Sequence, residues 1–141
     1  MTDLQTNIVI VLMGGACFAI VYKIPIRYFF HAAVLAMLAK LSMEFLQPHS
    51  HIAFSTFLTS FAIASISHII ARITGKPAQA FLVPGVMYLV PGTAIYKGFS
   101  AALVNDFSVT VPSLISTLTT TAAISFALLL ANWVVPSKRT L

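Results

Sequence analysis

Five long apolar runs, each ending at charged residues or helix breakers, constrain this chain more than any other feature. About 20 apolar residues in a helix are enough to cross the hydrocarbon core of a membrane. The runs leave only short loops and tails, so the sequence predicts an all-α, polytopic membrane helical bundle that forms one integral membrane domain over residues 1–141. The predicted spans cover residues 5–22, 28–46, 51–71, 78–96 and 111–135.

The composition excludes the other fold classes. Hydrophobic residues make up 59% of the chain and charged residues only 8%, whereas about a quarter of an average soluble domain is charged. The chain cannot cover itself with a polar surface, so a water-soluble globule is excluded. A membrane β-barrel is excluded as well, because no segment alternates polar and apolar residues over the length of a barrel strand.

Several function classes find no support in the sequence. The net charge of +5 comes from eight scattered Lys and Arg residues, which form no basic patch for nucleic acid. The single cysteine, Cys17, cannot build a disulfide framework or a four-thiolate metal site. His49 and His51 lack a third metal ligand. No nucleophile motif, phosphate-binding loop or pair of catalytic carboxylates is present, so we expect no enzyme activity, metal or cofactor.

The run at 28–46 contains two charged residues, Lys40 and Glu44, and can be read as a span or as a surface helix. Basic residues of short loops collect on the cytoplasmic side of a membrane. If 28–46 crosses the membrane, one side receives Lys23, Arg27, Arg72, Lys76, Lys138 and Arg139. A surface helix would move Arg72 and Lys76 to the outside, against this rule. We therefore expect five spans, with the N-terminus outside and the C-terminus in the cytoplasm.

The predicted fourth span contains the tetrapeptide Leu-Val-Pro-Gly twice, at residues 82–85 and 89–92. Each proline removes a helical N–H donor, and each glycine permits further unwinding. The spacing of seven residues is close to two helical turns, so both breaks would face about the same direction. Interrupted helices in membranes either pack inside the protein or line a watery cavity, as in transporter substrate sites. We favour a cavity over a kinked packing helix.

Hydroxyl groups without charge are concentrated in two of the predicted spans. Such side chains either bond helix carbonyls and neighbouring helices or coordinate a polar solute. Spacings of three and four residues also mark small-residue faces for close helix packing, at Ser60, Ala64, Ser67 and Ala71, and at Ser116, Thr120, Ala123, Ala127 and Ala131. The hydroxyl-rich segments contain Ser55, Thr56, Thr59, Ser60, Ser65 and Ser67, and Ser113, Ser116, Thr117, Thr119, Thr120, Thr121 and Ser125.

Ionisable residues at membrane depth are candidates for a gate or for proton coupling. Lys40 and Glu44 can pair one helical turn apart, and a structural role is as well supported as a gate. His68 is either a proton relay or a hydrogen-bonded packing residue, and we favour packing. Asp106, next to Asn105, is a turn residue or a proton or solute acceptor at the mouth of a pathway.

Three segments together resemble the threonine/serine exporter family. They are Phe-Ala-Ile-Val-Tyr-Lys-Ile-Pro-Ile-Arg at 18–27, Ser-Thr-Phe at 55–57, and the stretch 84–96 with Leu-Val-Pro-Gly followed by Tyr96. The chain is similar over nearly its whole length to the short subunit of the split, two-component bacterial form, which corresponds to the C-terminal membrane half of single-chain exporters. The family often has a proline three positions before the second Pro-Gly, where this chain has Tyr88.

The resemblance implies secondary-active export of a small polar metabolite across the bacterial inner membrane, driven by the proton gradient. The solute would be a threonine- or serine-type amino acid or a small dicarboxylate. It also implies a larger membrane subunit that resembles the N-terminal half of the exporter, and another copy of the chain is a second candidate partner. The alternative function is a non-transporting accessory or assembly subunit of another inner-membrane complex.

From these observations we predict a transport pathway at the broken fourth span. Its backbone groups would contact the carboxylate and amine of the solute, hydroxyls of the fifth span would complete the site, and Lys97 would attract carboxylates at the outer mouth. The predicted pathway residues are Pro84, Gly85, Pro91, Gly92, Thr93, Tyr96, Ser116, Thr117 and Thr120, and the candidates for a gate or proton coupling are Lys40, Glu44, His68 and Asp106.

Overall fold

The computed structural model describes residues 13–14, 17, 20–21 and 26–136. This part of the chain is helical and contains no strand, which confirms the all-α fold class. The first predicted span, 5–22, lies largely outside the described residues. The elements are α2 (Ile26–Leu46), the short 3-10 helix η1 (Gln47–His49), α3 (Ile52–Thr74), α4 (Gln79–Met87), α5 (Gly92–Leu103) and α6 (Phe107–Val134).

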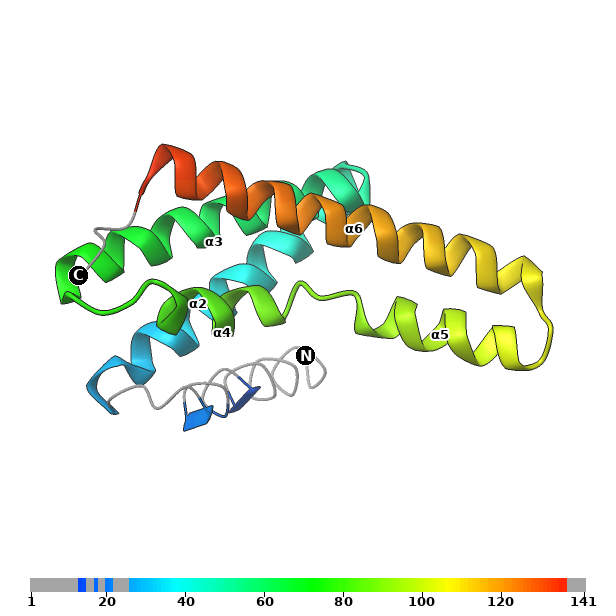
Figure 1. The fold of residues 1–141 in the computed structure, drawn as a ribbon, viewed down its shortest axis with the longest axis horizontal. Coiled ribbons are helices and arrows are strands. Elements are labelled where there is room, and N and C mark those ends of the chain that lie inside the picture. Colours follow the sequence, from blue (N-terminus) through cyan, green and yellow to red (C-terminus); the bar gives the residue numbers. More distant parts are fainter. Residues whose placement is uncertain (1–12, 15–16, 18–19, 22–25, 137–141) are drawn as a thin grey trace.

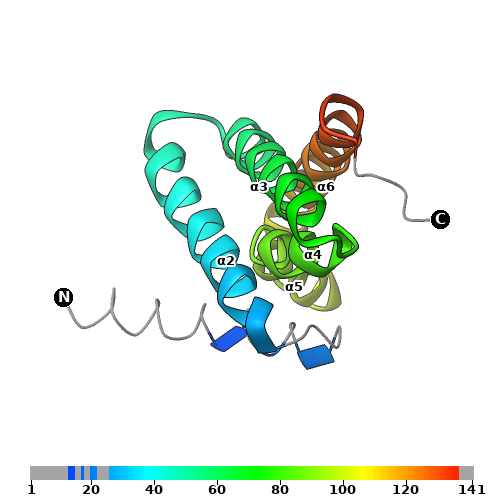
Figure 2. The ribbon, with the colours of Figure 1, turned by 90° about the vertical axis from the view of Figure 1, so that its left-hand side faces the viewer.

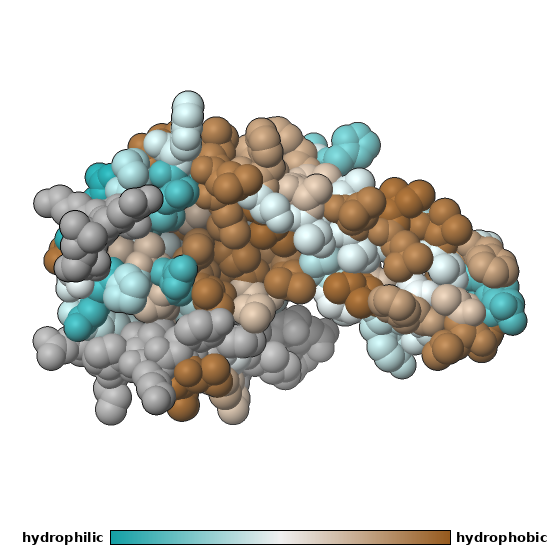
Figure 3. Space-filling model, viewed as in Figure 1, coloured by the Kyte–Doolittle hydropathy of each residue, from teal (hydrophilic) through white to brown (hydrophobic). Residues whose placement is uncertain are grey.

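Three of these helices are long and apolar enough to cross a membrane, over Tyr28–His49, Ile52–Thr74 and Phe107–Val134. The pair α4 and α5 meets the same criterion as one span bent by 51° at a short break. Figure 3 shows apolar side chains along the visible face of the molecule, with hydrophilic ones gathered towards its two ends. The chain is therefore a membrane protein with a helical bundle.

Helices α3, α4, α5 and α6 lie roughly along one direction, and α2 crosses them obliquely (Figures 1 and 2). In Figure 1, α2 and the α4–α5 pair run one way, and α3 and α6 run back. The ends of α3 and α6 are joined where the Arg72 guanidinium donates two hydrogen bonds to the carbonyl oxygen of Pro136. At the opposite end, the hairpin of α5 and α6 extends past the other helices (Figure 1).

The small-residue faces lie where helices pack closely. The most extensive contact between two described elements joins α3 and α6. On α3 the side chains of Ser60, Ala64, Ser67 and Ala71 are all buried. On α6, Thr120, Ala127 and Ala131 are buried as well. Small residues let helix backbones approach each other closely where the hydrophobic effect contributes little.

A second packing centre joins α2, α3 and α4. Leu35, Ile63 and Phe81 are at most 1% exposed and belong to one apolar cluster. Gly85 lies between two of these helices, because a Cβ built on it would come within 2.6 Å of the Cγ2 of Ile63 and 3.5 Å of the Cβ of Leu35. The absence of a side chain at Gly85 therefore sets how closely α4 approaches α3.

Two helix boundaries differ from those predicted. We expected Lys97 and Gly98 to end the fourth span, but both lie inside α5, which continues to Leu103. Gly98 is tolerated there because it faces α6, where a Cβ would lie 3.2 Å from Leu114. The turn comes instead at Asn105, whose φ of 57° is left-handed. Helix α6 then begins at Phe107, before the predicted start at 111, so Pro112 lies inside the helix.

Candidate functional site

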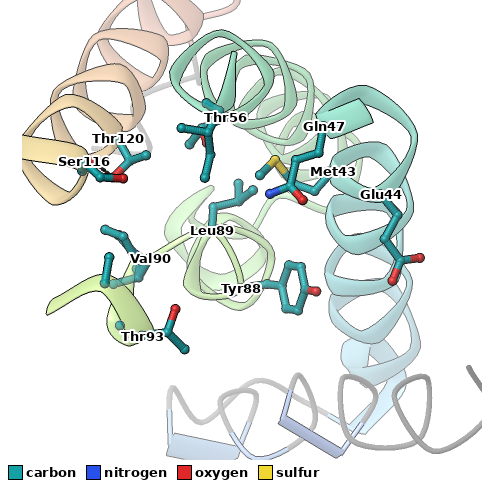
Figure 4. A pocket seen from close by; sticks show the side chains of 14 residues that line it. Met43, Glu44, Gln47, Thr56, Tyr88, Leu89, Val90, Thr93, Ser116 and Thr120 are labelled. Carbon is teal, nitrogen blue, oxygen red and sulfur yellow. Dashed lines mark hydrogen bonds between the residues drawn. The ribbon is translucent and has the colours of Figure 1, made fainter. Parts of the chain in front are cut away.

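A pocket of about 430 Å³ lies at the break between α4 and α5 (Figure 4). Helices α2, α3 and α6 and the 3-10 helix η1 supply its remaining walls. The break falls midway along the 79–103 helix pair, and on the other side the pocket reaches the end of α2 and the start of α3. Its lining consists of Met43, Glu44, Gln47, Ile52, Thr56, Tyr88, Leu89, Val90, Pro91, Gly92, Thr93, Ala94, Ser116 and Thr120.

The second Leu-Val-Pro-Gly sequence creates the break, as predicted. Pro91 has no N–H to donate and adopts φ −76° and ψ 53°, outside the helical region. The chain leaves α4 after Met87 and starts a new helix at Gly92. Local hydrogen bonds hold the link, with the Leu89 N–H donating to Val86 O at 2.8 Å and the Gly92 N–H to Val90 O at 2.8 Å.

The first Leu-Val-Pro-Gly sequence forms no break, and this part of the prediction is wrong. Pro84 lies inside the continuous helix α4, and both Pro84 and Gly85 are buried. Neither residue lines the pocket. Packing against Ile63 and Leu35 holds the helix together here although one of its hydrogen bonds is missing. Pro84 and Gly85 therefore serve packing in this structure.

Free backbone donors face the pocket at the start of α5. The hydrogen bonds around this helix start run from the Gly92 N–H to Val90 O and from the Ile95 N–H to Pro91 O. Within the described ranges, the N–H groups of Thr93 and Ala94 donate to no carbonyl, and no side chain caps the helix. The first turn of a helix carries partial positive charge and attracts anions. This wall of the pocket can bind a carboxylate.

Hydroxyl oxygens from two other helices face the same space. Thr56 donates its hydroxyl proton to Ile52 O at 2.7 Å, and Thr120 donates to Ser116 O at 2.7 Å. A hydroxyl that donates to its own helix keeps lone pairs that can accept a hydrogen bond from a solute. Ser116 and Thr93 also present hydroxyls to this space (Figure 4). The pocket therefore offers both donors and acceptors.

Among the residues that the structure describes, Glu44 is the single charged residue in the pocket lining. Its Oε1 lies 3.5 Å from the Nζ of Lys40, one helical turn away on α2. Lys40 is 2% exposed, whereas 44% of the Glu44 side chain is accessible. The pair predicted from the sequence is thus formed, with the cation inside the bundle and the carboxylate on the side of α2 turned away from Thr56 and Ser116 (Figure 4).

The remaining predicted residues lie away from the pocket. Tyr96 is 74% exposed on α5. Thr117 turns its hydroxyl to Ser113 O at 2.8 Å and does not reach the lining. His68 is buried near the other end of α3, and its Nδ1 makes no hydrogen bond within the part of the chain that the structure describes.

Asp106 has a structural role in the loop between α5 and α6. Its carboxylate accepts hydrogen bonds from the backbone N–H and the hydroxyl of Ser108, and so caps the N-terminus of α6. The hydrogen bond from the Ser108 hydroxyl lowers the pKa of this exposed carboxyl below its usual 3.8. The carboxylate therefore stays ionised at neutral pH.

Eight residues of the lining were missing from the predicted site: Met43, Gln47, Ile52, Thr56, Tyr88, Leu89, Val90 and Ala94. Thr56 was recognisable as a hydroxyl in a span, and Tyr88 as the position where the family often has proline. Met43 and Gln47 carry no local signal. They join the site because the end of α2 lies beside the start of α3.

Comparison with known proteins gives one match. Residues 7–134 match the family model described as "Threonine/Serine exporter, ThrE". No curated protein and no solved structure matches the chain. The family match covers all the described helices together with the broken span and its pocket. The chain therefore belongs to the threonine/serine exporter family.

Proposed function

We propose that the chain exports a small polar metabolite of the threonine or serine type through the pocket at the α4–α5 break. The observation that carries this proposal is the combination of free N–H groups at the start of α5 with hydroxyl oxygens on α3 and α6 around one pocket. Broken helices supply such groups in transporter substrate sites. The alternative, a non-transporting assembly subunit, offers no reason for a pocket with both donors and acceptors at a broken helix.

We further propose that a larger membrane subunit completes the pathway. The described residues leave one side of the pocket open, and the α5–α6 hairpin carries large exposed apolar side chains such as Phe99, Leu103 and Phe107. A second bundle from that subunit would close the open side. The same proposal places the protein in the bacterial inner membrane, with the end that carries Arg72 and Lys76 in the cytoplasm.

Removing the pocket hydroxyls tests the proposed function. We expect the double variant Ser116→Ala with Thr120→Val to weaken solute binding, by about tenfold for each lost hydrogen bond to the solute. The measurement is release of free threonine from cells loaded with a threonine-containing dipeptide, in the presence of the partner subunit. A matched control is Thr121→Val, because Thr121 lies on the exposed side of α6 and donates to its own helix at Thr117 O. Equal release from the double variant and the control would contradict the proposal.

Asp106 provides a second test, directed at proton coupling. Asparagine also caps helices well, so Asp106→Asn should keep α6 intact and leave threonine release unchanged, whereas Asp106→Ala should fray the helix start. A lowered pKa in the folded state contributes stability above the usual pKa, and this contribution is lost as the pH falls through the lowered value. Near neutral pH the Asp106 carboxyl group is therefore ionised and has no proton to donate. Loss of release in an abundant Asp106→Asn protein would instead assign Asp106 to proton transfer.

A further inference from the structure

The pocket lies near one end of helix α3, so a solute that crosses the bundle must also pass along the rest of this helix. The pocket lining includes Ile52 and Thr56, in the first two turns of α3, whereas Arg72 lies in its last turn. The helix rises by about 24 Å from Thr56 to Arg72. The residues of α3 that face other helices along this length are buried. Any route from the pocket to the Arg72 end is therefore closed in the structure.

The face of α3 that packs against α6 carries polar side chains along this closed length. Two contacts mark the face: the rings of Phe57 and Phe126 lie with centroids 6.2 Å apart, and the Arg72 guanidinium donates to Pro136 O. Figures 1 and 2 both show the two helices side by side. We call the stretch of this interface between the two contacts the α3–α6 seam. Its buried α3 residues are Ser60, Ala64, Ser67, His68 and Ala71, and its buried α6 residues include Ala127 and Ala131.

Two polar atoms of the seam have no partner. Ser60 is 0% exposed and His68 is 6% exposed, and neither the Ser60 Oγ nor the His68 Nδ1 has a hydrogen-bond partner among the described residues. A buried polar atom without a partner costs free energy, so such atoms call for a functional explanation. The Ser67 hydroxyl donates to Ile63 O at 2.8 Å and keeps lone pairs that can accept a hydrogen bond. A polar solute in the seam would supply partners to all three side chains.

The opposite interface of α3 is sealed by large apolar side chains. There α3 packs against α2 and α4 through Leu35, Ile63 and Phe81, which are at most 1% exposed. Opening this interface to a watery route would expose large apolar surfaces at a high cost in free energy. Separating α3 from α6 between Ser60 and Ala71 would expose mainly small and polar side chains. The seam is therefore the interface of α3 that opens at the lower cost.

We propose that the α3–α6 seam is the second half of the solute pathway, and that it opens when Arg72 releases the carbonyl oxygen of Pro136. Ser60, Ser67 and His68 then line the route between the pocket and the Arg72 end of the bundle. Many transporters alternate in this way, because one group of helices moves against another around a fixed site. This inference rests on the proposed function, because it assumes that the solute passes through the pocket.

The test measures how fast introduced cysteines react with a small, charged, membrane-impermeant thiol reagent. The full chain carries Cys17→Ser and is combined with the partner subunit in inside-out vesicles, which expose the proposed cytoplasmic end with Arg72. During threonine uptake into these vesicles, Ser60→Cys and Ser67→Cys should react at least about tenfold faster than Ser125→Cys, since a thiol needs water to form the reactive thiolate. Ser125 is a matched control because it lies on the exposed side of α6 and donates its hydroxyl to its own helix.

The same reaction tests whether the solute uses the seam. The group added to Ser60→Cys occupies the route, so threonine uptake should fall to the level of vesicles without the chain. The same treatment should leave uptake by Ser125→Cys unchanged. Arg72→Lys keeps the positive charge but loses the planar group that donates twice to Pro136 O. In this variant, Ser67→Cys should react severalfold faster.

The outcomes distinguish the two proposals. If the Cys17→Ser protein transports no threonine although the unsubstituted chain is also abundant and inactive, the proposed function itself fails. If threonine is transported while abundant Ser60→Cys and Ser67→Cys proteins do not react, or while modified Ser60→Cys transports normally, the second half of the pathway lies elsewhere. An unchanged rate in Arg72→Lys would overturn the role of Arg72. Fast reaction at both seam positions, with transport blocked by modification of Ser60→Cys, supports the proposed route.

Discussion

Replacing Gly85 by leucine is expected to prevent stable folding of the bundle. A Cβ at this position already comes within 2.6 Å of the Ile63 Cγ2, a distance that forces a shift. Ile63 is 1% exposed and β-branched, so its side chain has little freedom to turn away. Overpacking a core typically costs about 1–3 kcal/mol and occasionally more, and leucine adds three further carbons. The measurement is the yield of monodisperse protein after mild detergent extraction and its melting temperature.

A smaller substitution with a rescue variant tests the cause. Alanine favours a helix over glycine by roughly 0.5–1 kcal/mol. Gly85→Ala should nevertheless lower the free energy of unfolding, because its Cβ would clash with Ile63. Combining Gly85→Ala with Ile63→Ala removes the clashing methyl group. The double variant should then be more stable than the sum of the single effects predicts, with a coupling of about 0.5–3 kcal/mol. Additive effects would mean that the contact between α4 and α3 is not what restricts Gly85.

Replacing Gly92 by leucine is expected to abolish export while leaving the fold intact. A Cβ at Gly92 would meet no atom within 4 Å, and Gly92 lines the pocket. The leucine side chain would therefore project into free space that the solute needs. It would also lie next to the Thr93 and Ala94 N–H groups and shield them from a carboxylate.

The measurement for Gly92→Leu combines threonine release with protein abundance and melting temperature. Release should fall to the level of cells without the chain, and the melting temperature should match the wild-type value. Gly92→Ala is the graded control, because a single methyl group fills little of the pocket. Normal release from an abundant Gly92→Leu protein would place the solute pathway elsewhere in the bundle.

The contrast between Gly85 and Gly92 shows what the sequence could and could not predict. Each is the last residue of a Leu-Val-Pro-Gly sequence, so local rules predict two equal helix breaks. Only the second occurs, since α4 around Pro84 is held between Leu35 and Ile63. Apolar run length predicted the long helices well, because it reflects a requirement of the membrane itself. Tertiary packing decides which of two identical breaks persists.

The same limit applies to the candidate site. The Pro91–Gly92 break and the hydroxyls of Ser116 and Thr120 were predictable, because proline and buried hydroxyls mark local needs for hydrogen bonds. That Gln47 lies beside these residues was not predictable, because nothing in the sequence near Gln47 specifies how α2 packs against the other helices. Tyr96 was expected in the site with Thr93, but it lies about one turn further along α5, outside the pocket lining, and is exposed.

The projecting hairpin has a consequence for the surrounding lipid. Helix α6 has 28 residues, which corresponds to a length of about 42 Å, whereas the hydrocarbon core of a bilayer is about 30 Å thick. The helix must tilt, thicken the bilayer around it, or extend its Asp106 end into the headgroups. Longer acyl chains would cover more of the hairpin and reduce its tilt. Because α5 begins at the pocket and ends in this hairpin, a change in bilayer thickness would change the angle between α4 and α5 at Pro91.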